Sequence, residues 1–379
     1  MTTGGRSRFS VPPPRPIAWA LAYTCWIVYA VLDFGPQVRD IIKVFPWSQW
    51  WGFDGDLILQ AGRRFLDGQP IYADSRFMYA PAAAVFGIAG ALVPREYALL
   101  AYAFFKVALA IGVTYRLTHG SWLSVIAVLT FLPFINDVAP GNFMVPITAA
   151  MAIATFGQPR RRSGIFLGIM GATIPKPFLV PYFLWLLVYR RKAAEGAIAT
   201  GALVALMAAV VTGPASYIDW LQSLRNGAPL IATWDGNYGV SNYLPTLAIP
   251  IAVAVLLLTL IVVARADENR SLAWVLAAGI LVSPYAGPLE GLPLLLALPI
   301  LRPWPRVYAI AMLQPLTTIS VAVAGIVALI VGPLSAMPAR RAKPADGVPP
   351  SPGDAPVAPD SRPSPDVAAG PEVAAEAVP

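Results

Sequence analysis

The sequence predicts an all-α membrane protein, built as a polytopic bundle of transmembrane helices. The chain has 379 residues, of which 57% are hydrophobic and 12% charged, and its mean hydropathy is +0.63. This composition excludes an ordinary soluble globule. Apolar runs recur between residues 17 and 333, several of them near the roughly 20 residues that a helix needs to cross a bilayer. From hydropathy we expect roughly 9 to 12 helices.

The N-terminal end predicts a retained first helix. Residues 1–16 contain three consecutive prolines and are expected to be disordered and cytoplasmic. The apolar run 17–35 follows arginines, as a signal peptide would, but no small-residue cleavage site follows it. The lone cysteine, Cys25, lies within this run and excludes an intramolecular disulfide.

Further apolar segments predict the rest of a membrane domain that extends over residues 17–336. The segment after it, 337–379, is expected to be a disordered tail, because 11 of the last 42 residues are proline and none is aromatic. Several of the predicted spans are too short to cross a bilayer alone. The candidates are residues 80–94, 97–117, 121–136, 143–157, 164–175, 178–189, 196–213, 243–264, 271–287, 289–301 and 307–333.

The basic residues indicate orientation in a membrane. The net charge is +7, but the positive side chains cluster in short turns, which is typical of cytoplasmic loops and gives no sign of a nucleic-acid partner. Residues 160–162 and 190–192 are the strongest such turns. Counting crossings from them places the loop 36–79, the turn with Lys176 and the polar segment 213–242 on the extracytoplasmic face. It also predicts a broken or re-entrant pair around 136–142.

The loop 36–79 holds five of the 20 acidic residues: Asp40, Asp54, Asp56, Asp67 and Asp74. From residue 54 to residue 66, apolar side chains recur at helical spacing, and Gly68 supplies a stop, which predicts a juxtamembrane amphipathic helix. Asp54 is placed to cap this helix and Asp56 to interact with its dipole. Local pattern alone favours capping over catalysis. Trp47, Trp50 and Trp51 suit an interfacial belt.

The most specific signal in the sequence is a set of spaced motifs. Asp54 is followed by a small residue seven positions later and then by a glycine and Tyr72. The other motifs are Phe77-Met78-Tyr79-Ala80-Pro81, Pro140-Gly141-Asn142, Gly164-Ile165-Phe166-Leu167-Gly168 leading to Ile174-Pro175-Lys176-Pro177, and Ser283-Pro284. Over about residues 50–300 these motifs resemble glycosyltransferase family 87.

The resemblance implies an enzyme of the GT-C superfamily. Such enzymes move a sugar from a polyprenyl-phosphate carrier to a hydroxyl of a glycolipid or cell-envelope glycan, with mannose the expected sugar ahead of arabinofuranose. The presumed catalytic base of the family maps onto Asp54, with Asp56 as the nearby alternative. The family often continues its Ser-Pro motif into a tryptophan and a histidine. This chain reads Tyr285-Ala286-Gly287-Pro288-Leu289-Glu290 instead.

The chemistry of sugar transfer predicts roles for further residues. A carboxylate within reach of a sugar hydroxyl takes its proton as the bond to the anomeric carbon forms. The leaving lipid phosphate needs a cation, for which Lys176 is the candidate, with Arg63 and Arg64 contributing. Alternatively, Lys176 snorkels to water and the two arginines contact lipid headgroups. Residues in the matching motifs that are expected to bind substrate are Tyr72, Tyr79 and Asn142.

Two other function classes stay open at this point. A transporter or lipid-flipping protein would hold ionisable groups at membrane depth, and Lys106 is the one clear candidate. A non-catalytic subunit with the same fold is compatible with the missing histidine. The single histidine, His119, excludes a multi-histidine metal site, and we expect no cofactor. No phosphate-binding or dinucleotide motif supports nucleotide-driven transport.

Overall fold

The computed structural model of the chain describes residues 52–232, 239–283, 286–302, 306 and 321–338. Within these ranges every regular element is a helix, and the only pairing of extended backbone is an isolated bridge between Leu301 and Ala336. The all-α prediction is confirmed for this part of the chain. Outside it lie the predicted first span, the tryptophans 47, 50 and 51, and nearly all of the predicted tail.

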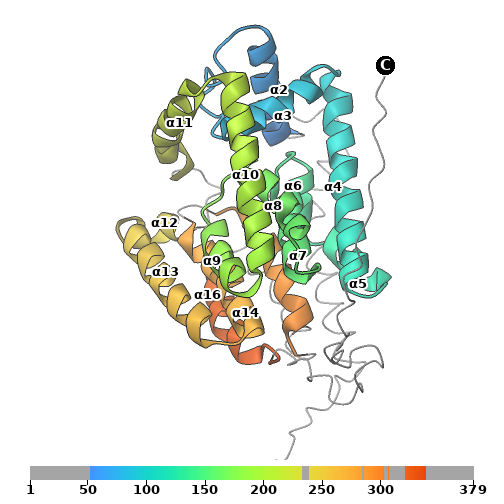
Figure 1. Cartoon of the computed structure of the whole chain (residues 1–379), viewed down its shortest axis with the longest axis vertical. Helices are drawn as coiled ribbons and strands as arrows, with labels where there is room; N and C mark the ends of the chain where they lie inside the picture. Colours follow the sequence, from blue (N-terminus) through green and yellow to red (C-terminus); the bar gives the residue numbers. More distant parts are fainter. Residues whose placement is uncertain (1–51, 233–238, 284–285, 303–305, 307–320, 339–379) are drawn as a thin grey trace, which may run out of the picture. The chain divides into compact units, whose positions relative to one another are not determined.

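Three helices open the described chain (Figure 1): α2 over Phe53–Leu66, α3 over Pro81–Ala91 and α4 over Arg95–Leu117. Helices α2 and α3 pack so closely that a Cβ atom at Gly62 would collide with the backbone of Gly87. Small residues at such crossings let two backbones approach each other. Residues 54–66, which were predicted to be helical, lie in α2, and the position of this helix in an outer loop beside a membrane stays a prediction.

The segment predicted as one span, 121–136, is broken into two short helices. Helix α5 covers Trp122–Leu129 and α6 covers Leu132–Val138. Ser121 caps α5 by accepting a hydrogen bond from the Ser124 amide (3.3 Å), and Pro133 lies in the first turn of α6, where a missing N–H is tolerated. Neither helix is long enough to cross a bilayer, which agrees with the expected break before α7, Met144–Phe156.

The two basic turns lie together at the start of α10. The elements here are η1 (Arg161–Gly164), α8 (Ile165–Thr173), α9 (Leu179–Tyr189) and α10 (Arg191–Thr212). Glu195 of α10 forms ion pairs with Arg161 (3.1 Å) and Arg191 (3.3 Å). Helix α10 begins five residues before the predicted span, because its first turn is polar and was assigned to the loop.

The polar segment 213–242 is not wholly a loop. It contains α11, Ala215–Ala232, whose Trp220 indole donates to the Met78 carbonyl (3.0 Å) and whose Ser223 hydroxyl donates to the Phe77 carbonyl (2.9 Å). The remaining elements are α12 (Val240–Tyr243), η2 (Pro245–Leu247), α13 (Ala248–Arg265), α14 (Glu268–Val282), the proline-containing η3 (Pro288–Ile300) and α16 (Val321–Ser335). Helices α13, α14 and η3 follow predicted spans to within about five residues, and α16 covers the end of the span predicted over 307–333, whose first part lies outside the described residues.

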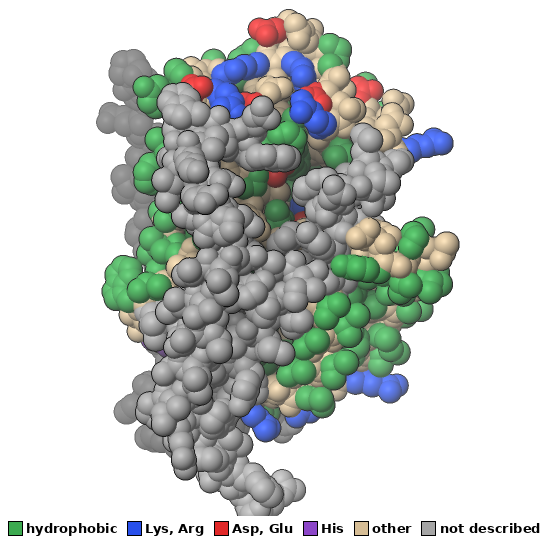
Figure 2. All heavy atoms as spheres, turned by 180° about the vertical axis from the view of Figure 1, so that it is seen from behind, with side chains coloured by type: hydrophobic (Ala, Val, Ile, Leu, Met, Phe, Trp, Pro, Cys, Tyr) green, Lys and Arg blue, Asp and Glu red, His purple; other side chains and the backbone are tan. Residues whose placement is uncertain are grey.

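The surface has the pattern of a membrane protein. Three helical segments of the described residues, 95–117, 191–212 and 245–265, are long and apolar enough to cross a bilayer, and several shorter apolar helices accompany them. Their outer faces expose large apolar side chains such as Val210 and Leu257. Figure 2 shows a mainly hydrophobic band between two ends that carry charged side chains. The chain therefore forms a membrane protein, and the total number of spans stays a prediction.

Helix α10 extends between the two polar ends of the membrane domain. Its first turn pairs with η1, and its last turn leads into α11, which contacts the segment before α3. In Figure 1, α2 lies at the end of α10 opposite to the basic turns. With 22 residues, α10 is about 33 Å long, which matches the hydrocarbon thickness of a bilayer. This separation is the one expected if α2 and the basic turns face opposite sides of a membrane.

Candidate active site

The site is built where a turn docks onto the N-terminus of α2. The Gly52 amide donates to the Ala139 carbonyl (2.7 Å), and the Asp54 amide donates to the Pro140 carbonyl (2.7 Å). The Asn142 side-chain amide donates to Asp54 Oδ2 at 2.7 Å. Two segments nearly 90 residues apart in sequence are thereby joined at a single carboxylate.

The capping alternative for Asp54 is wrong. The residue at the N-cap of α2 is Gly52, with φ 72°, a left-handed conformation that glycine adopts at low cost. Carbonyls of the turn at residues 139 and 140, rather than a side chain, satisfy the first amides of the helix. Asp54 lies one position further into the helix than the start, and its side chain points to Asn142 instead of back to the backbone.

Tyr79 gives the carboxylate a second hydrogen bond, donated by its phenolic hydroxyl to Asp54. The backbone carbonyl of Tyr79 accepts from the Tyr72 hydroxyl at 2.9 Å. The ring of Tyr79 packs edge-on against Phe77 and Phe143, with centroids 5.7 and 5.8 Å away. Tyr79 is thus fixed on both sides, and Tyr72 supports it from behind without reaching Asp54.

Lys176 lies within electrostatic range of Asp54, in the turn between α8 and α9. Its ammonium forms an ion pair with Glu290 Oε1 at 2.9 Å, and Glu290 Oε2 accepts the Gly287 amide at 2.8 Å. Both side chains are largely buried, with 12% and 4% of their surface exposed. Glu290 is therefore a site residue that sequence reasoning missed, and it was visible as the departure from the histidine of the family motif.

The other predicted residues lie away from this centre. Asp56 forms an ion pair with Arg95 Nε (2.8 Å) and accepts from Gln60 (2.6 Å), so it links α2 to the start of α4. Arg63 and Arg64 lie in the last turn of α2, about 14 Å along the helix from Asp54. Arg64 faces Asp74 at 3.8 Å instead.

Burial sets the acidity of Asp54. Removal of the side chain from water raises the pKa of its carboxyl above the ordinary value, because the charged form loses hydration. The hydrogen bonds from Asn142 and Tyr79 and the positive charges of Lys176 and Lys106 act in the opposite direction. Burial is the larger effect. The arrangement produces a carboxylate that is a stronger base than a solvated aspartate while remaining hydrogen-bonded.

Lys106 of α4 lies beneath the turn and forms an ion pair with Asp137 Oδ2 at 3.2 Å. Neither side chain has any exposed surface. Sequence reasoning singled out Lys106 but missed its partner. A signal was present, because Asp137 is the only acidic residue between Glu96 and Glu195. A lysine in the middle of an apolar helix requires a counter-charge, and Asp137 is the only acidic residue in the apolar region that follows.

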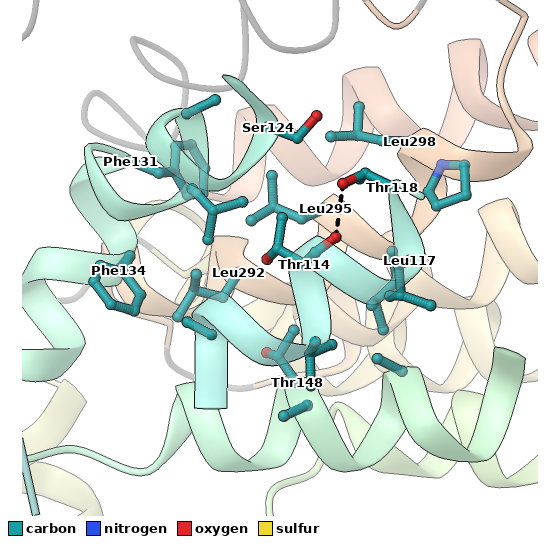
Figure 3. Close-up of a pocket in the computed structure, with 18 of the residues that line it drawn as sticks. Thr114, Leu117, Thr118, Ser124, Phe131, Phe134, Thr148, Leu292, Leu295 and Leu298 are labelled. Atoms are coloured by element: carbon teal, nitrogen blue, oxygen red, sulfur yellow. Dashed lines mark hydrogen bonds between the residues drawn. The ribbon is translucent and has the colours of Figure 1, made fainter. Parts of the chain in front are cut away.

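A cavity of about 630 Å³ lies deeper in the bundle (Figure 3). Its lining is mainly apolar and comes from α4, α5, α6, α7 and η3, with Val145 three residues beyond Asn142 and Leu292 two residues beyond Glu290. Figure 3 shows Thr114, Leu117, Phe131, Leu292 and Leu295 around it. His119 and Arg306 also line it. Cavities of this size and polarity are typical of small-molecule sites.

The sequence model of glycosyltransferase family 87 matches residues 77–284, more than half of the chain. The chain belongs to glycosyltransferase family 87. Comparison with curated proteins and with solved structures finds no match. The matched region contains Tyr79, Asn142 and Lys176, whereas Asp54 and Glu290 lie outside it.

Membership of glycosyltransferase family 87 makes the protein a membrane glycosyltransferase, with a sugar donor and an acceptor as its substrates. It confirms the resemblance read from the sequence motifs. Within the described residues, no group of three histidine, cysteine, aspartate or glutamate side chains is arranged to hold a metal ion.

Proposed function

We propose that the protein transfers a sugar, mannose in the first instance, from a polyprenyl-phosphate carrier to a hydroxyl of a glycolipid or cell-envelope glycan. The observation that supports this most directly is the half-buried carboxylate of Asp54, hydrogen-bonded by Asn142 and Tyr79, with Lys176 within electrostatic range. A proton acceptor beside a cation is the minimum that transfer from a phosphate carrier requires.

In this mechanism Asp54 accepts the proton of the acceptor hydroxyl as its oxygen bonds to the anomeric carbon. The bond from that carbon to the phosphate oxygen breaks, and the electron pair leaves with the lipid phosphate. Lys176 stabilises the negative charge that develops there. Glu290 holds the ammonium in place through its ion pair. Asp56, engaged by Arg95, serves the helix packing and not the chemistry.

The apolar cavity supports a lipid carrier as the donor. Its lining is mainly apolar and is formed in part by α7 and η3, the helices that follow Asn142 and contain Glu290, so it offers a hydrocarbon chain a place to be buried. We place the prenyl chain of the donor in this cavity and its phosphate at Lys176. The active site would then face the extracytoplasmic side, opposite to the basic turns around Arg161 and Arg191.

Reconstitution of the purified protein in lipid nanodiscs tests the proposal. Transfer of labelled mannose from polyprenyl-phosphate mannose to lipid extracts of a deletion strain is expected, with no transfer from a nucleotide sugar. The matched control is Asp54→Asn in the same membranes. A wild-type protein that binds the donor but transfers nothing to any acceptor would favour a non-catalytic subunit.

A further inference from the structure

The pair formed by Lys106 and Asp137 has no direct part in the mechanism above. The two side chains have no exposed surface, so neither is available to a substrate. Burying two charges is costly, and replacing such a pair by apolar residues often stabilises a protein. The pair therefore calls for an explanation beyond stability.

The pair fixes both ends of the turn 137–142. The Lys106 ammonium donates to the carbonyls of Asp137 (2.5 Å) and Asn142 (3.0 Å), in addition to its ion pair. Asp137 Oδ1 accepts the Met144 amide at 2.6 Å, at the start of α7. The ring of Tyr102 lies 4.8 Å from the ammonium, and its hydroxyl donates to the Asn142 carbonyl at 3.0 Å. Helix α4 thus contacts both ends of the turn, and Asp137 also joins its first residue to the start of α7.

The same turn provides two groups that form hydrogen bonds with Asp54. It provides the Pro140 carbonyl that accepts the Asp54 amide and the Asn142 amide that donates to the carboxylate. Asn142 Oδ1 accepts the Phe143 amide at 2.7 Å, which leaves its NH₂ group facing Asp54. Gly141, with φ 79°, lies against Gly55, so the turn has little room to shift.

We propose that Lys106 and Asp137 are positioning residues that hold the turn 137–142 so that Asn142 orients the Asp54 carboxylate for proton transfer. This inference rests on the proposed role of Asp54 as the base. It assigns a function within the transferase to the intramembrane lysine that the sequence left unexplained. It also removes Lys106 as a coupling group for transport, because the ammonium is enclosed by protein.

The pH–rate profile distinguishes positioning from simple stabilisation. The groups that act on Asp54 are Tyr79, Lys106, Asn142 and Lys176, and Lys106 lowers the pKa of the carboxyl. In Lys106→Met the acid limb of kcat/KM against pH is therefore expected to move to higher pH. The kcat should fall roughly 10- to 100-fold, as expected for a displaced catalytic group, with the donor KM nearly unchanged.

Two further variants make the test decisive. Asp137→Asn keeps the side-chain shape but leaves the ammonium without its counter-charge, and the same kcat loss is expected. Thr259→Val removes another fully buried polar group, in α13, and is expected to reduce stability without moving the profile. If Lys106→Met and Asp137→Asn do not fold, Lys106→Arg carries the test, since it keeps the charge and changes the donor geometry.

The outcomes separate this inference from the proposed function. Loss of transfer in Asp54→Asn, together with wild-type kcat and pH profile in folded variants of the pair, would overturn the positioning role alone. Full activity of Asp54→Asn would overturn the proposed base and the inference together. A donor KM that rises in Lys106→Met while kcat stays constant would also contradict positioning, because it would indicate contact with substrate.

Discussion

Asn142 donates a hydrogen bond of 2.7 Å to Asp54, and this contact joins the first helix of the described chain to the turn before α7. The contact matters because a buried carboxylate rotates freely unless its oxygens are held. With one oxygen engaged by Asn142, the other lone pairs keep a defined direction. Several measurable consequences follow from the environment of this carboxylate.

The first prediction concerns pH. The pKa of Asp54 is raised by burial above its ordinary value of 3.8, and the base works only when deprotonated. Transfer should therefore be lost as the pH falls through this raised pKa, at a pH above that of a solvated aspartate. Measurement of kcat/KM against pH in nanodiscs checks this. An acid limb at or below 3.8 would contradict the buried-base assignment.

Asn142→Ala removes the hydrogen bond that lowers the pKa of Asp54. The acid limb is expected to move to higher pH, and kcat to fall roughly 10-fold or more, because the carboxylate loses its orientation. Asn269→Ala is a matched control, since Asn269 also donates through its side chain, to the Met337 carbonyl at 2.8 Å. Equal profiles for the two variants would exclude a special role for Asn142.

Lys176→Met tests whether the ammonium group contributes to catalysis. If Lys176 stabilises the leaving phosphate, kcat should fall on the order of 10²-fold, the effect typical of losing one charge-stabilising donor. Arg190→Met breaks another partly buried ion pair, with Glu268 at 2.7 Å, and should leave kcat near the wild-type value. Single-turnover rates with labelled donor separate this effect from donor binding. A change only in protein yield would indicate that Lys176 is structural.

Glu290→Gln is expected to strengthen binding of the donor, whereas Lys176→Met is expected to slow catalysis. The amide keeps the volume of the side chain and retains an acceptor for the Gly287 amide, but it no longer neutralises Lys176. The positive potential at the site should therefore increase, and the KM for the phosphate-linked donor should fall. Donor titrations at constant acceptor give this value. A raised KM would indicate that Glu290 contacts the substrate itself.

The sequence indicated which residues lie around Asp54 better than it indicated which contacts they make. Spaced motifs brought Tyr79, Asn142 and Lys176 into consideration with Asp54, and all four lie together in the structure. The motifs gave Glu290 no role, although it lies in the segment 285–290 where the sequence departs from the family's Ser-Pro continuation. Local helix rules failed at Gly52, because the cap of α2 comes from a turn nearly 90 residues away. Long-range caps of this kind leave no local pattern.

Prediction of the helices from hydropathy succeeded for apolar segments and failed for polar ones. Hydropathy located nearly every described helix to within a few residues, since burial in lipid or protein requires apolar side chains. It missed α11, because the polar residues of Ala215–Ala232 lower its hydropathy below that of a transmembrane run. The charge-stabilisation argument, in turn, gave Arg63 and Arg64 a contribution beside Lys176, but they lie at the other end of α2 from Asp54.

The strongest prediction compares Asp54→Asn with Asp56→Asn. Removing the base should reduce transfer about 10²- to 10⁴-fold. Because the pKa of Asp54 is raised in the folded protein, ionisation of its buried carboxyl costs stability at every pH above that pKa, and the cost disappears as the pH falls towards 3.8. Asp54→Asn should therefore match or exceed the thermal stability of the wild type at neutral pH.

Asp56→Asn should show the reverse pattern. It weakens the 2.8 Å ion pair with Arg95, and loss of a partly exposed pair costs about 1 kcal/mol or less of unfolding free energy. Transfer should remain close to the wild-type rate, because Asp56 is engaged between α2 and α4 and does not face Asn142. Thermal unfolding and transfer rates, measured on both variants in the same nanodiscs, give the comparison. Inactive Asp56→Asn beside active Asp54→Asn would move the base to Asp56.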